Sequence, residues 1–428
     1  MTRRDAEVLV VGAGPAGAAT AFFLARAGLD VLVLDRARFP RDKPCAEYLS
    51  PQASRILHEM DALTAVESAG AAHLTGMRLR APNGTVIHGE FAAAHGFRGF
   101  RDRGLALRRL VLDDLLLARA RAMGARVMEQ AMVRDLEYDG HGRVLGVVVG
   151  THSGTRTLRA PLVIGADGLR SVVGRRLGLT RSGRFPRRVA LVSHFTGVLG
   201  MGACGEMHVD AAGYLGLADV GGGTTNVALV IPVRDATSLH GALDAFLARW
   251  IADRPHLATR FRDASPLANA RATGPFNSHA RRAWAPGAAL VGDAADFFDP
   301  FTGEGIYAAL RGAELLTGYA FDAARATGAA RHDVALAAYD RCRRHEFRGK
   351  RRVERAIART VSSPALFNRV AAVLAARPDM ADLLVGVAGD FVPPREVLRP
   401  GFLLRLLLAP AGTLPPDSRA TGAAAGRA

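Results

Sequence analysis

The sequence predicts an α/β fold: a Rossmann-type dinucleotide-binding domain, an antiparallel sheet inserted into it, and helices towards the C-terminal end. The first observation is an apolar run at residues 8–11 that leads at once into a glycine-rich turn and a helical segment. That order is typical of a buried strand opening a βαβ unit. The second is that strand-like runs alternate with glycine loops from about residue 186 to 272. The third is a mostly helical, arginine-rich stretch from about residue 333 to 408.

The glycine-rich turn reads Gly12-Ala13-Gly14-Pro15-Ala16-Gly17 and has the spacing of a dinucleotide-binding motif. Gly12 permits the tight turn, Gly14 lets the backbone approach a pyrophosphate, and Gly17 allows close helix–strand packing. The following helix offers unpaired N–H groups and a positive dipole end to the phosphates. We therefore predict that Gly12, Gly14, Pro15, Ala16 and Gly17 bind a dinucleotide cofactor.

The second strand, residues 31–34, ends in Asp35, which lies 18 positions after Gly17. That spacing is close to the roughly 20 positions expected for an acid that binds the adenosine ribose hydroxyls. Arg36 beside it would suit a phosphorylated ribose, but an acid at the end of the strand disfavours that. Asp35 and Arg36 are both candidate cofactor contacts.

Two further glycine signatures follow strand-like runs much later in the chain. The first, Gly165-Ala166-Asp167-Gly168, ends a buried run at residues 161–166, and the second, Gly292-Asp293, follows a run at residues 288–291. Gly292-Asp293 leads into Pro300-Phe301-Thr302-Gly303-Glu304-Gly305. Three signatures in this order favour flavin over nicotinamide as the tightly held cofactor.

With Arg109-x-x-Leu112-Asp113-x-x-Leu116 and the extended run to Leu169-Arg170-Ser171, these motifs resemble the FAD-dependent oxidoreductases of the para-hydroxybenzoate hydroxylase type. That superfamily includes aromatic hydroxylases, flavin-dependent halogenases and geranylgeranyl reductases. The resemblance spans about residues 5 to 330 and implies an FAD-binding domain of the GR2 type.

The resemblance also implies residue roles. Asp293 is expected to bond a ribityl hydroxyl of FAD, and Arg109 to reach the FAD phosphates. Asp167 and Gly168 are expected beside the pyrophosphate, in a loop linked to transient NAD(P)H binding. The remaining expected contacts form the loop beneath the isoalloxazine and the strand end before it: Gly292, Pro300, Gly303, Glu304, Gly305 and Ile306. Backbone donors there stabilise the negative charge of reduced flavin. Two positions depart from the pattern, since Gly174 stands where arginine is frequent and Ile306 where many aromatic hydroxylases have asparagine.

The segment at residues 41–51 resembles the Cys-Gly-(Gly/Glu)-x-Leu-Ser-Pro loop of the geranylgeranyl reductase group, with Ala46 in place of glycine. By this resemblance the loop passes near the flavin. Cys45 and Glu47 are therefore candidate catalytic groups, together with Pro300 and Gly303 of the flavin loop. Cys45 is equally well interpreted as a buried, inert residue, and Glu47 as a polar or proton-handling group.

Two motifs that mark particular enzyme groups of this superfamily are absent from the sequence. The halogenase Trp-x-Trp-x-Ile-Pro motif is missing, because the two tryptophans, Trp250 and Trp284, lie far apart. Residues 214–219 replace the Tyr-x-Trp-x-Phe-Pro motif of geranylgeranyl reductases. We therefore expect an NAD(P)H-dependent monooxygenase that hydroxylates an apolar aromatic or a quinone- or phenol-like substrate through a flavin 4a-hydroperoxide. Phe297, Phe298 and Phe301 are expected either to wall its pocket or to pack in the core. The alternative is reduction of C=C bonds in an isoprenoid or other lipophilic substrate, and a redox-silent flavin module is a third reading.

The charge and residue composition of the chain limit the kinds of partner and ligand that we expect. The net charge is +16, from 56 basic and 40 acidic residues, yet no basic run is interleaved with aromatic residues, which disfavours nucleic acid. The charge is either a dispersed solvated surface or an attraction to an acidic substrate or an anionic membrane. The arginine clusters at residues 341–344 and 348–352 fit either reading. Three widely spaced cysteines predict a reducing cytoplasm without disulfides. No spacing predicts a metal site, and no apolar run is long enough to span a membrane. The oligomeric state is left open.

The domain boundaries follow from these patterns. Residues 1–185 and 273–330 form the predicted FAD-binding domain, and residues 186–272 the substrate-binding domain, which strands at about 75–100 are expected to join. Residues 331–410 form the helical region, and 411–428 a disordered tail. Within the first domain a helix is predicted over residues 105–124 and a strand over 126–133.

Overall fold

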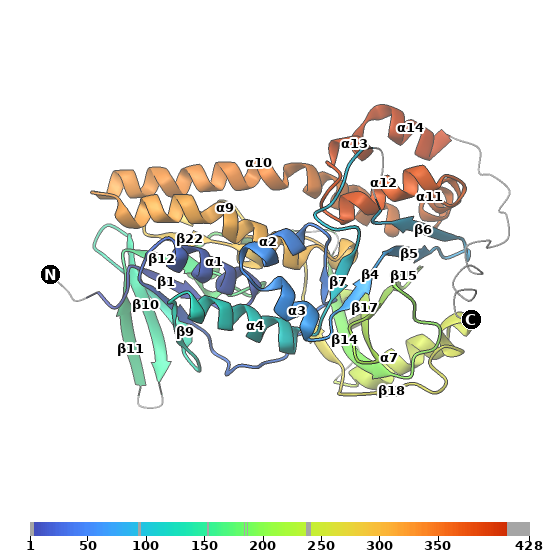
Figure 1. Ribbon diagram of the computed structural model, residues 1–428, viewed down its shortest axis with the longest axis horizontal. Helices are drawn as coiled ribbons and strands as arrows, with labels where there is room; N and C mark the ends of the chain where they lie inside the picture. Colours follow the sequence, from blue (N-terminus) through green and yellow to red (C-terminus); the bar gives the residue numbers. More distant parts are fainter. Residues whose placement is uncertain are drawn as a thin grey trace.

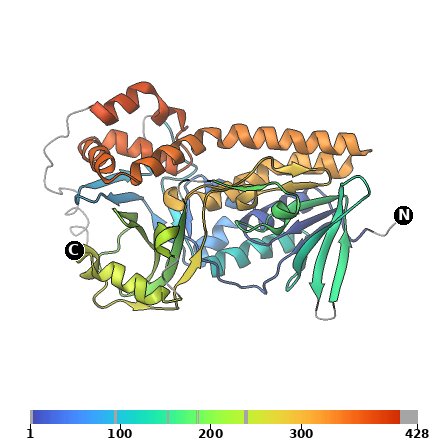
Figure 2. The ribbon, with the colours of Figure 1, turned by 180° about the vertical axis from the view of Figure 1, so that it is seen from behind.

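The computed structural model describes residues 4–92, 96–151, 154–183, 185, 187–236 and 241–408. Figure 1 shows a mainly parallel sheet beside a larger antiparallel sheet, with the long helix α10 (Ala329–Val361) running above them. The reverse view shows α10 leading to the C-terminal helices over the antiparallel sheet (Figure 2). The predicted disordered tail lies outside the described residues.

The parallel sheet has the strand order β21-β22-β12-β1-β2-β8, and its β21–β22 pair is antiparallel. Its strands are β1 (Val8–Val11), β2 (Val31–Leu34), β8 (Arg126–Met128), β12 (Leu162–Gly165), β21 (Trp284–Ala285) and β22 (Ala288–Leu290). In this register Val11 of β1 lies beside Gly165 of β12, which in turn lies beside Leu290 of β22. The three glycine signatures that follow these strands therefore meet at one edge of the sheet.

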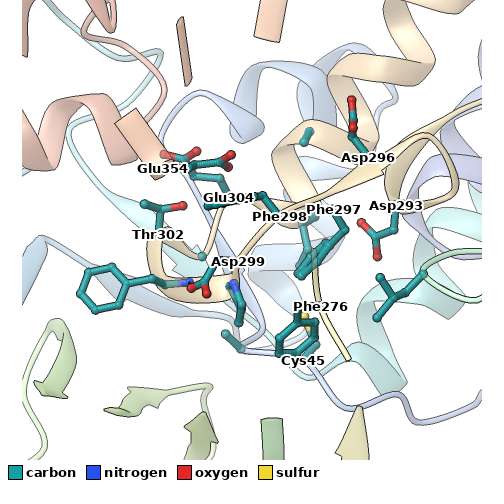
Figure 3. Close-up of a pocket in the computed structure, with 18 of the residues that line it drawn as sticks. Cys45, Phe276, Asp293, Asp296, Phe297, Phe298, Asp299, Thr302, Glu304 and Glu354 are labelled. Carbon is teal, nitrogen blue, oxygen red and sulfur yellow. The ribbon is translucent and has the colours of Figure 1, made fainter. Parts of the chain in front are cut away.

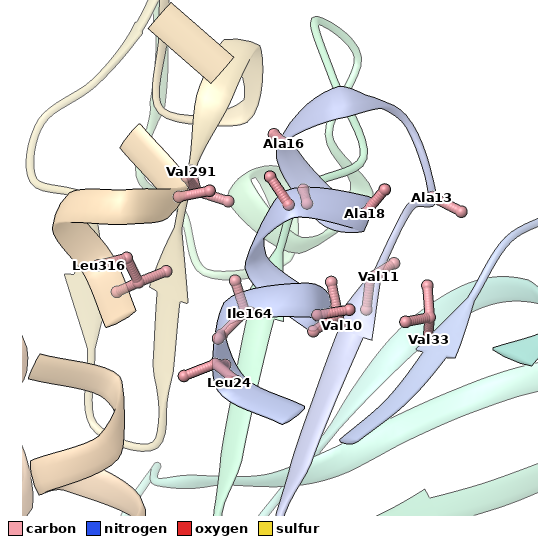
Figure 4. Packing of buried hydrophobic residues seen from close by; sticks show 14 of the residues in the cluster. Val10, Val11, Ala13, Ala16, Ala18, Leu24, Val33, Ile164, Val291 and Leu316 are labelled. Carbon is pink, nitrogen blue, oxygen red and sulfur yellow. The ribbon is translucent and has the colours of Figure 1, made fainter. Parts of the chain in front are cut away.

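The helices around this sheet pack closely because their inward faces are small. Helix α1 (Pro15–Arg26) is buried from Pro15 to Leu24 and lies against α4 (Arg109–Ala122) and α9 (Gly305–Arg325). Figure 4 shows Ala16, Ala18 and Leu24 of α1 packed among the valines of β1 and Ile164 of β12. Close packing at this point fixes where α1 begins, and hence where its N-terminal N–H groups lie.

Two predicted elements differ from the structure. The predicted helix at residues 105–124 begins only at Arg109, because residues Gly104–Ala106 form strand β7 and pair with β3 (Tyr48–Leu49) and β4 (Ala72–Leu74). The predicted strand at residues 126–133 is two strands, β8 and β9 (Met132–Tyr138), and Gln130 between them has a positive φ of 56°. Strands β7 and β8 pair with strands far upstream, whereas β9 pairs with the next strand along the chain, so tertiary pairing outweighs the local pattern. Strand β9 forms a separate three-stranded sheet with β10 (Val144–Thr151) and β11 (Gly154–Arg159), and a turn at residues 139–143 joins β9 to β10.

The antiparallel sheet has the order β18-β14-β17-β16-β15-β5-β6, and β19 also pairs with β14. Its strands are β5 (Gly76–Arg80), β6 (Val86–Glu90), β14 (Arg188–Thr196), β15 (Cys204–Asp210), β16 (Gly213–Asp219), β17 (Thr224–Pro232), β18 (Ser265–Pro266) and β19 (Arg271–Thr273). Strands β5 and β6 come from far upstream and join through a parallel pairing of β5 with β15. The sequence did not predict β15, because buried Glu206 and His208 on it read as polar; each bonds the other, and Glu206 also pairs with Arg260.

Alternate residues of this sheet face two different apolar layers. Leu191 and Leu229 face α7 (Leu243–Ala252), with α8 (Pro255–Ala258) beside it. Val192 and Val230 face the other way, in a cluster with Phe301 and residues of α11 (Pro364–Ala376) and α12 (Pro378–Ala388). The second face therefore looks towards the predicted flavin loop.

The remaining elements connect these layers. They are α2 (Ala53–Glu59), α3 (Leu63–Ser68), α5 (Val172–Arg176), α6 (Val233–Ala236), α13 (Arg395–Leu398), α14 (Pro400–Leu408), the 3-10 turns η1 (Gly292–Ala294) and η2 (Pro300–Thr302), and a small sheet of β13 (Thr180–Ser182), β20 (Ser278–Ala280) and β23 (Asp296–Phe297). Among the described residues, no helix combines the length and apolar character needed to cross a lipid bilayer.

Candidate active site

One cavity of about 1070 Å³ joins the three glycine signatures to the antiparallel sheet. Its walls include Gly14, Gly168, Asp293 and Gly303 from the glycine signatures and the loop after them, and Val192 from the antiparallel sheet. Figure 3 shows Asp293, Phe297, Phe276 and Cys45 around this space. A cavity of this size is at the upper end of the range for small-molecule and cofactor sites, so it has room for a dinucleotide and part of a second molecule.

Cationic side chains surround Gly14 at one end of the cavity. A Cβ placed on Gly14 would lie 3.4 Å from Nη2 of Arg41 and 3.6 Å from Nη2 of Arg109. Buried Asp113 orients both guanidinium groups, at 2.8 Å from Nη1 of Arg41 and 2.6 Å from Nε of Arg109. The bare backbone of Gly14 and these two cations form a cradle for a pyrophosphate. The predicted role of Arg109 fits this geometry, whereas Arg41 was not predicted.

Lys43 is a further cation that the sequence analysis missed. Its Nζ lies 3.3 Å from the position of a Cβ on Gly168, and it lines the cavity. Burial and the neighbouring Arg109 lower the pKa of Lys43, while Asp293 opposes them. The available signal was the pair of basic residues just before Pro44, in the loop predicted to pass near the flavin.

Asp35 shapes the glycine-rich turn from the end of β2. Its carboxylate accepts hydrogen bonds from the backbone N–H of Ala13 at 2.7 Å and of Ala37 at 2.8 Å. Arg36 is exposed next to it. Pro15 is the first residue of α1, and Ala16 lines the cavity. Gly12 has a φ of 98°, in the left-handed region that favours glycine, and a Cβ on it would clash with Ala166. The ribose contact of Asp35 stays a prediction.

Asp167 lies in the loop after β12, where its carboxylate stabilises the start of helix α5. Its carboxylate accepts hydrogen bonds from Oγ of Ser171 at 2.5 Å and from the backbone N–H of Val172 at 2.5 Å, which holds the start of α5. Burial raises the pKa of Asp167 although these hydrogen bonds oppose the shift. Asp167 is not among the residues that line the cavity, whereas Gly168 is. The backbone of Gly168, with a φ of 78°, is therefore the part of this motif available to a ligand.

The Asp293 carboxylate faces the cavity and has no hydrogen-bond partner within the described part of the chain. Burial raises the pKa of Asp293, and the charges of Lys43 and Arg109 oppose that shift. Gly292 before it has a φ of 61°, and a Cβ there would lie 2.7 Å from Cβ of Ala16. An acid that is half-buried without a hydrogen-bond donor fits a cofactor hydroxyl as its partner.

The predicted flavin loop has a glycine, Gly303, at the point where its backbone approaches Tyr48 most closely. Gly303 has a φ of 71°, and a Cβ there would lie 2.9 Å from Cδ1 of Tyr48. Pro300 begins η2, and Gly305 begins the 21-residue helix α9 with Ile306 buried behind it. The N-terminal end of a long helix stabilises negative charge, as the reduced flavin ring requires. These residues fit the pyrimidine end of an isoalloxazine.

Asp299, which the sequence analysis missed, fastens this loop to the antiparallel sheet. It accepts hydrogen bonds from Nη1 of Arg188 at 2.8 Å, Oη of Tyr214 at 2.7 Å and the backbone N–H of Phe301 at 3.1 Å. Arg188 and Tyr214 come from β14 and β16, and both are buried. The position of the loop relative to the sheet is therefore set by a buried charged contact.

Glu304 and Glu354 form an acidic pair beside the loop, as Figure 3 shows. Glu304, predicted to contact the cofactor, is buried and lies 2.9 Å from Nζ of Lys350, which also contacts Asp390. Glu354 lines the cavity, and burial followed by the nearby Glu304 raises the pKa of Glu354 to about 8. Burial and the neighbouring carboxylate therefore favour the protonated form of Glu354. Nothing in the sequence alone distinguished it from the surrounding charged helix.

The two candidate catalytic groups of the loop at residues 41–51 are separated by the structure. Cys45 is partly exposed and lines the cavity. Glu47 is fully buried and does not line it. Instead, Oε2 of Glu47 lies 2.7 Å from Nε2 of His194 and 3.0 Å from Nδ2 of Asn226, and Oε1 accepts from the backbone N–H of Arg109 at 2.7 Å. The proton-handling role of Glu47 stays a prediction, but the network around it is structural.

The far wall of the cavity is apolar and aromatic. Phe276 and Phe297 contact each other with ring centroids 5.2 Å apart, and Phe301 packs edge-on against Tyr214 at 5.0 Å. Phe298 also lines the cavity. The two interpretations of the predicted phenylalanines therefore combine, because Phe297 and Phe301 belong to an apolar cluster and form the wall as well.

A family model described as an FAD binding domain matches residues 5–349. The chain belongs to this family of FAD-binding proteins. FAD is therefore the cofactor expected in this cavity, as the resemblance implied. The match explains why the cations, the bare glycines and the partnerless Asp293 line a single cavity.

Curated relatives of this FAD-binding protein include two reductases. Menaquinone reductase of Mycobacterium tuberculosis is 40% identical over 176 residues, which is 41% of this chain and 40% of that protein. The match thus spans less than half the length of that relative. Digeranylgeranylglycerophospholipid reductase 2 of Methanopyrus kandleri is 33% identical over 311 residues, 71% of this chain and 74% of that protein. Among solved structures, the flavin-dependent brominase Bmp2 is similar with a TM-score of 0.79 over 94% of this chain and 97% of that chain, at 19% identity. That similarity shows the fold alone.

Proposed function

We propose that this protein is an FAD-dependent reductase that saturates a C=C bond of an isoprenoid or similarly lipophilic substrate. The observation that carries the proposal is the continuity of the FAD cavity with the apolar face of the antiparallel sheet. The names of the two relatives support it, since a quinone lipid and a geranylgeranyl lipid are both unsaturated and apolar. The sequence motifs favoured hydroxylation; the names of these two relatives support placing reduction first in this proposal.

The residues of the chain divide the work of such a reaction. When bound, reduced FAD supplies a hydride to one alkene carbon while a proton joins the other, and we propose NAD(P)H as the reductant that restores the flavin. The cluster around Gly14, Arg41 and Arg109 holds the pyrophosphate, and Asp293 orients the ribityl chain. The aromatic wall of Phe276, Phe297 and Phe301 places an apolar chain against the ring and excludes water. Glu354, whose pKa is raised, is the carboxyl group at the cavity wall that can hold a proton.

The second candidate is hydroxylation of an aromatic or quinone-like substrate, in which dioxygen supplies the oxygen atom and NAD(P)H the electrons. The aromatic wall favours it, because tilted and edge-on aromatic side chains can contact both the face and the edge of a planar ring. Water exclusion matters for this reaction as well. The two candidates therefore share a site and differ in whether oxygen is consumed.

The test is a comparison of turnover with and without dioxygen. FAD-loaded protein is mixed with NADPH and either a prenylated quinone or a phenol, and products are analysed by mass spectrometry. A product formed under strictly anaerobic conditions that stays heavier by two hydrogens after any quinol has been reoxidised to the quinone supports reduction of a C=C bond. An oxygen atom incorporated from labelled dioxygen, with no anaerobic product, supports hydroxylation. FAD-loaded protein with no substrate-stimulated oxidation of NADPH would contradict both.

We also propose that the protein works in the cytoplasm, at the membrane surface where such lipids reside. Helix α14 supports this, because Leu403, Leu404, Leu407 and Leu408 on it are exposed, while Phe402 and Leu406 pack on the apolar cluster beneath. Exposed leucines on an amphipathic helix bury favourably in a lipid interface, and a net charge of +16 adds attraction to anionic lipids.

A further inference from the structure

Helix α10 carries a stripe of arginines that the proposed function does not use. Arg348, Arg352, Arg355 and Arg359 are spaced four, three and four residues apart, so they lie on one face of the helix. We call these four residues the arginine stripe. All four are exposed, and all four line the same cavity as Gly14 and Asp293. The stripe therefore borders the cavity where it meets solvent and is not an ordinary solvated face.

The positive charges of the arginine stripe are not paired with carboxylates, unlike those of the other arginines nearby on α10. Arg343 and Arg351 each lie 2.6 Å from Oδ2 of Asp296, and Arg344 lies 2.7 Å from Oδ2 of Asp340. By contrast, none of the four stripe arginines has an ion pair or a hydrogen bond within the parts of the chain that the structure describes. The charges that hold α10 in place and those that face the cavity opening are thus different sets.

Nearby acids leave the charge of the stripe uncancelled. Glu346 on the same helix is engaged by Arg311 at 2.7 Å, and Glu304 by Lys350. Glu354 lies between Arg352 and Arg355 in sequence, but it is partly buried at the cavity wall beside Glu304. Four guanidinium groups along one helix face, with their donors free, match the geometry of phosphate oxygens.

The stripe is also close to the place where chemistry is proposed. Arg343 and Arg351 fix α10 on Asp296 of β23, and β23 leads directly into the flavin loop at Pro300. A ligand whose apolar part lies along the aromatic wall would place a charged end at the opening, against α10.

We propose that the arginine stripe is a binding site for the phosphate or diphosphate group of a ligand whose remainder enters the cavity. This rests on the proposed function, because it assigns a charged end to that site's substrate or reductant. Two sources share this chemistry: a lipophilic substrate with a phosphorylated head, and the phosphates of NAD(P)H. The stripe is distinct from the cluster around Gly14, which serves the pyrophosphate of FAD.

The test uses FAD-loaded protein, so that the FAD phosphate site is already filled, and inorganic pyrophosphate as the probe. Calorimetry compares the wild type with the double variant R352Q/R355Q, since glutamine keeps the helix and removes the charge. The control is R331Q/R341Q, which removes two exposed charges from α10 outside this cavity. We expect pyrophosphate to bind the wild type and the control alike, and the stripe variant to bind about tenfold or more weakly.

Competition then identifies the source. Displacement of pyrophosphate by a prenyl diphosphate, but not by the matching prenyl alcohol, assigns the site to the substrate; displacement by NADPH assigns it to the reductant. Equal binding by wild type and stripe variant, no binding to FAD-loaded wild type, or binding that neither ligand displaces would overturn the inference. Retained FAD in all three proteins distinguishes that outcome from a failure of the proposed function, which the turnover assay tests separately.

Discussion

Glu47 offers the sharpest test of how the loop at residues 41–51 works. Replacing Glu47 by glutamine keeps the volume of this fully buried side chain and removes its charge. The glutamine amide must then face either His194 and Asn226 or the backbone N–H of Arg109, and all of these donate to the native carboxylate. If the new NH₂ group faces His194 and Asn226, both of these donors lose their acceptor. If it faces the backbone N–H of Arg109, two donors oppose each other.

The size of the effect follows from the contacts. Two hydrogen bonds to a buried carboxylate are worth about 1.5–3 kcal/mol each, and they are not additive because they share one oxygen, so E47Q should cost about 3 kcal/mol. FAD should also bind about tenfold more weakly, because Glu47 holds the first residue of α4 and Arg109 is that residue. Urea titration gives the free energy of unfolding, and flavin fluorescence gives the affinity.

The matched control is Glu137, whose pair with Arg159 is partly solvent-exposed. E137Q should change the free energy of unfolding by less than about 1 kcal/mol and leave FAD binding intact. A stable E47Q variant with normal FAD affinity and an altered pH profile of turnover would refute this reasoning, and would show that Glu47 handles protons, as the sequence suggested.

Three further predictions concern other parts of the site. D293N should weaken FAD binding, measured by flavin fluorescence, without lowering the stability of the apoprotein, because the carboxylate has no protein donor to lose; an apoprotein made less stable would contradict that. The folded-state pKa of Glu354, about 8, exceeds the ordinary value of 4.5, so its contribution to stability is complete below pH 4.5 and is lost as the pH rises towards 8. The melting temperature of E354Q relative to the wild type should accordingly rise between about pH 5 and about pH 8, and a constant difference would count against the raised pKa. L404S/L408S should reduce co-sedimentation with anionic lipid vesicles, whereas L267S, which changes an exposed leucine elsewhere, should not; equal loss in both would remove α14 from the membrane proposal.

Residues with local signals are the ones whose position in the fold the sequence can indicate. Gly12, Gly292 and Gly303 have left-handed backbones or neighbours that leave no room for a Cβ, and such demands are met by glycine alone. Asp293 follows a short buried strand, so its position at the sheet edge could be predicted from the pattern. Arg41 and Lys43 were missed although they lie in the predicted loop at residues 41–51. The orientation of Arg41 depends on Asp113, which belongs to the distant helix α4.

Asp299 shows why other features could not be predicted. Its partner Arg188 is 111 positions away, and neither residue belongs to a motif. The same holds for His194 and Asn226, which are opposite each other in the β14–β17 register and meet Glu47 across the gap between two sheets. Long-range polar contacts of this kind leave no periodicity in the sequence.

The sequence by itself determined the nucleotide-binding edge and the cofactor, because backbone turns, helix starts and glycine positions are local consequences of residue type. Only the tertiary structure decided which side chains line the part of the cavity beyond the expected cofactor. It places β5 and β6 beside β15, joins the flavin loop to β14 and β16 through Asp299, and places the arginine stripe of α10 along the cavity. The physical reason is that burial and charge pairing between distant segments depend on how whole layers pack, and no stretch of chain contains that information alone.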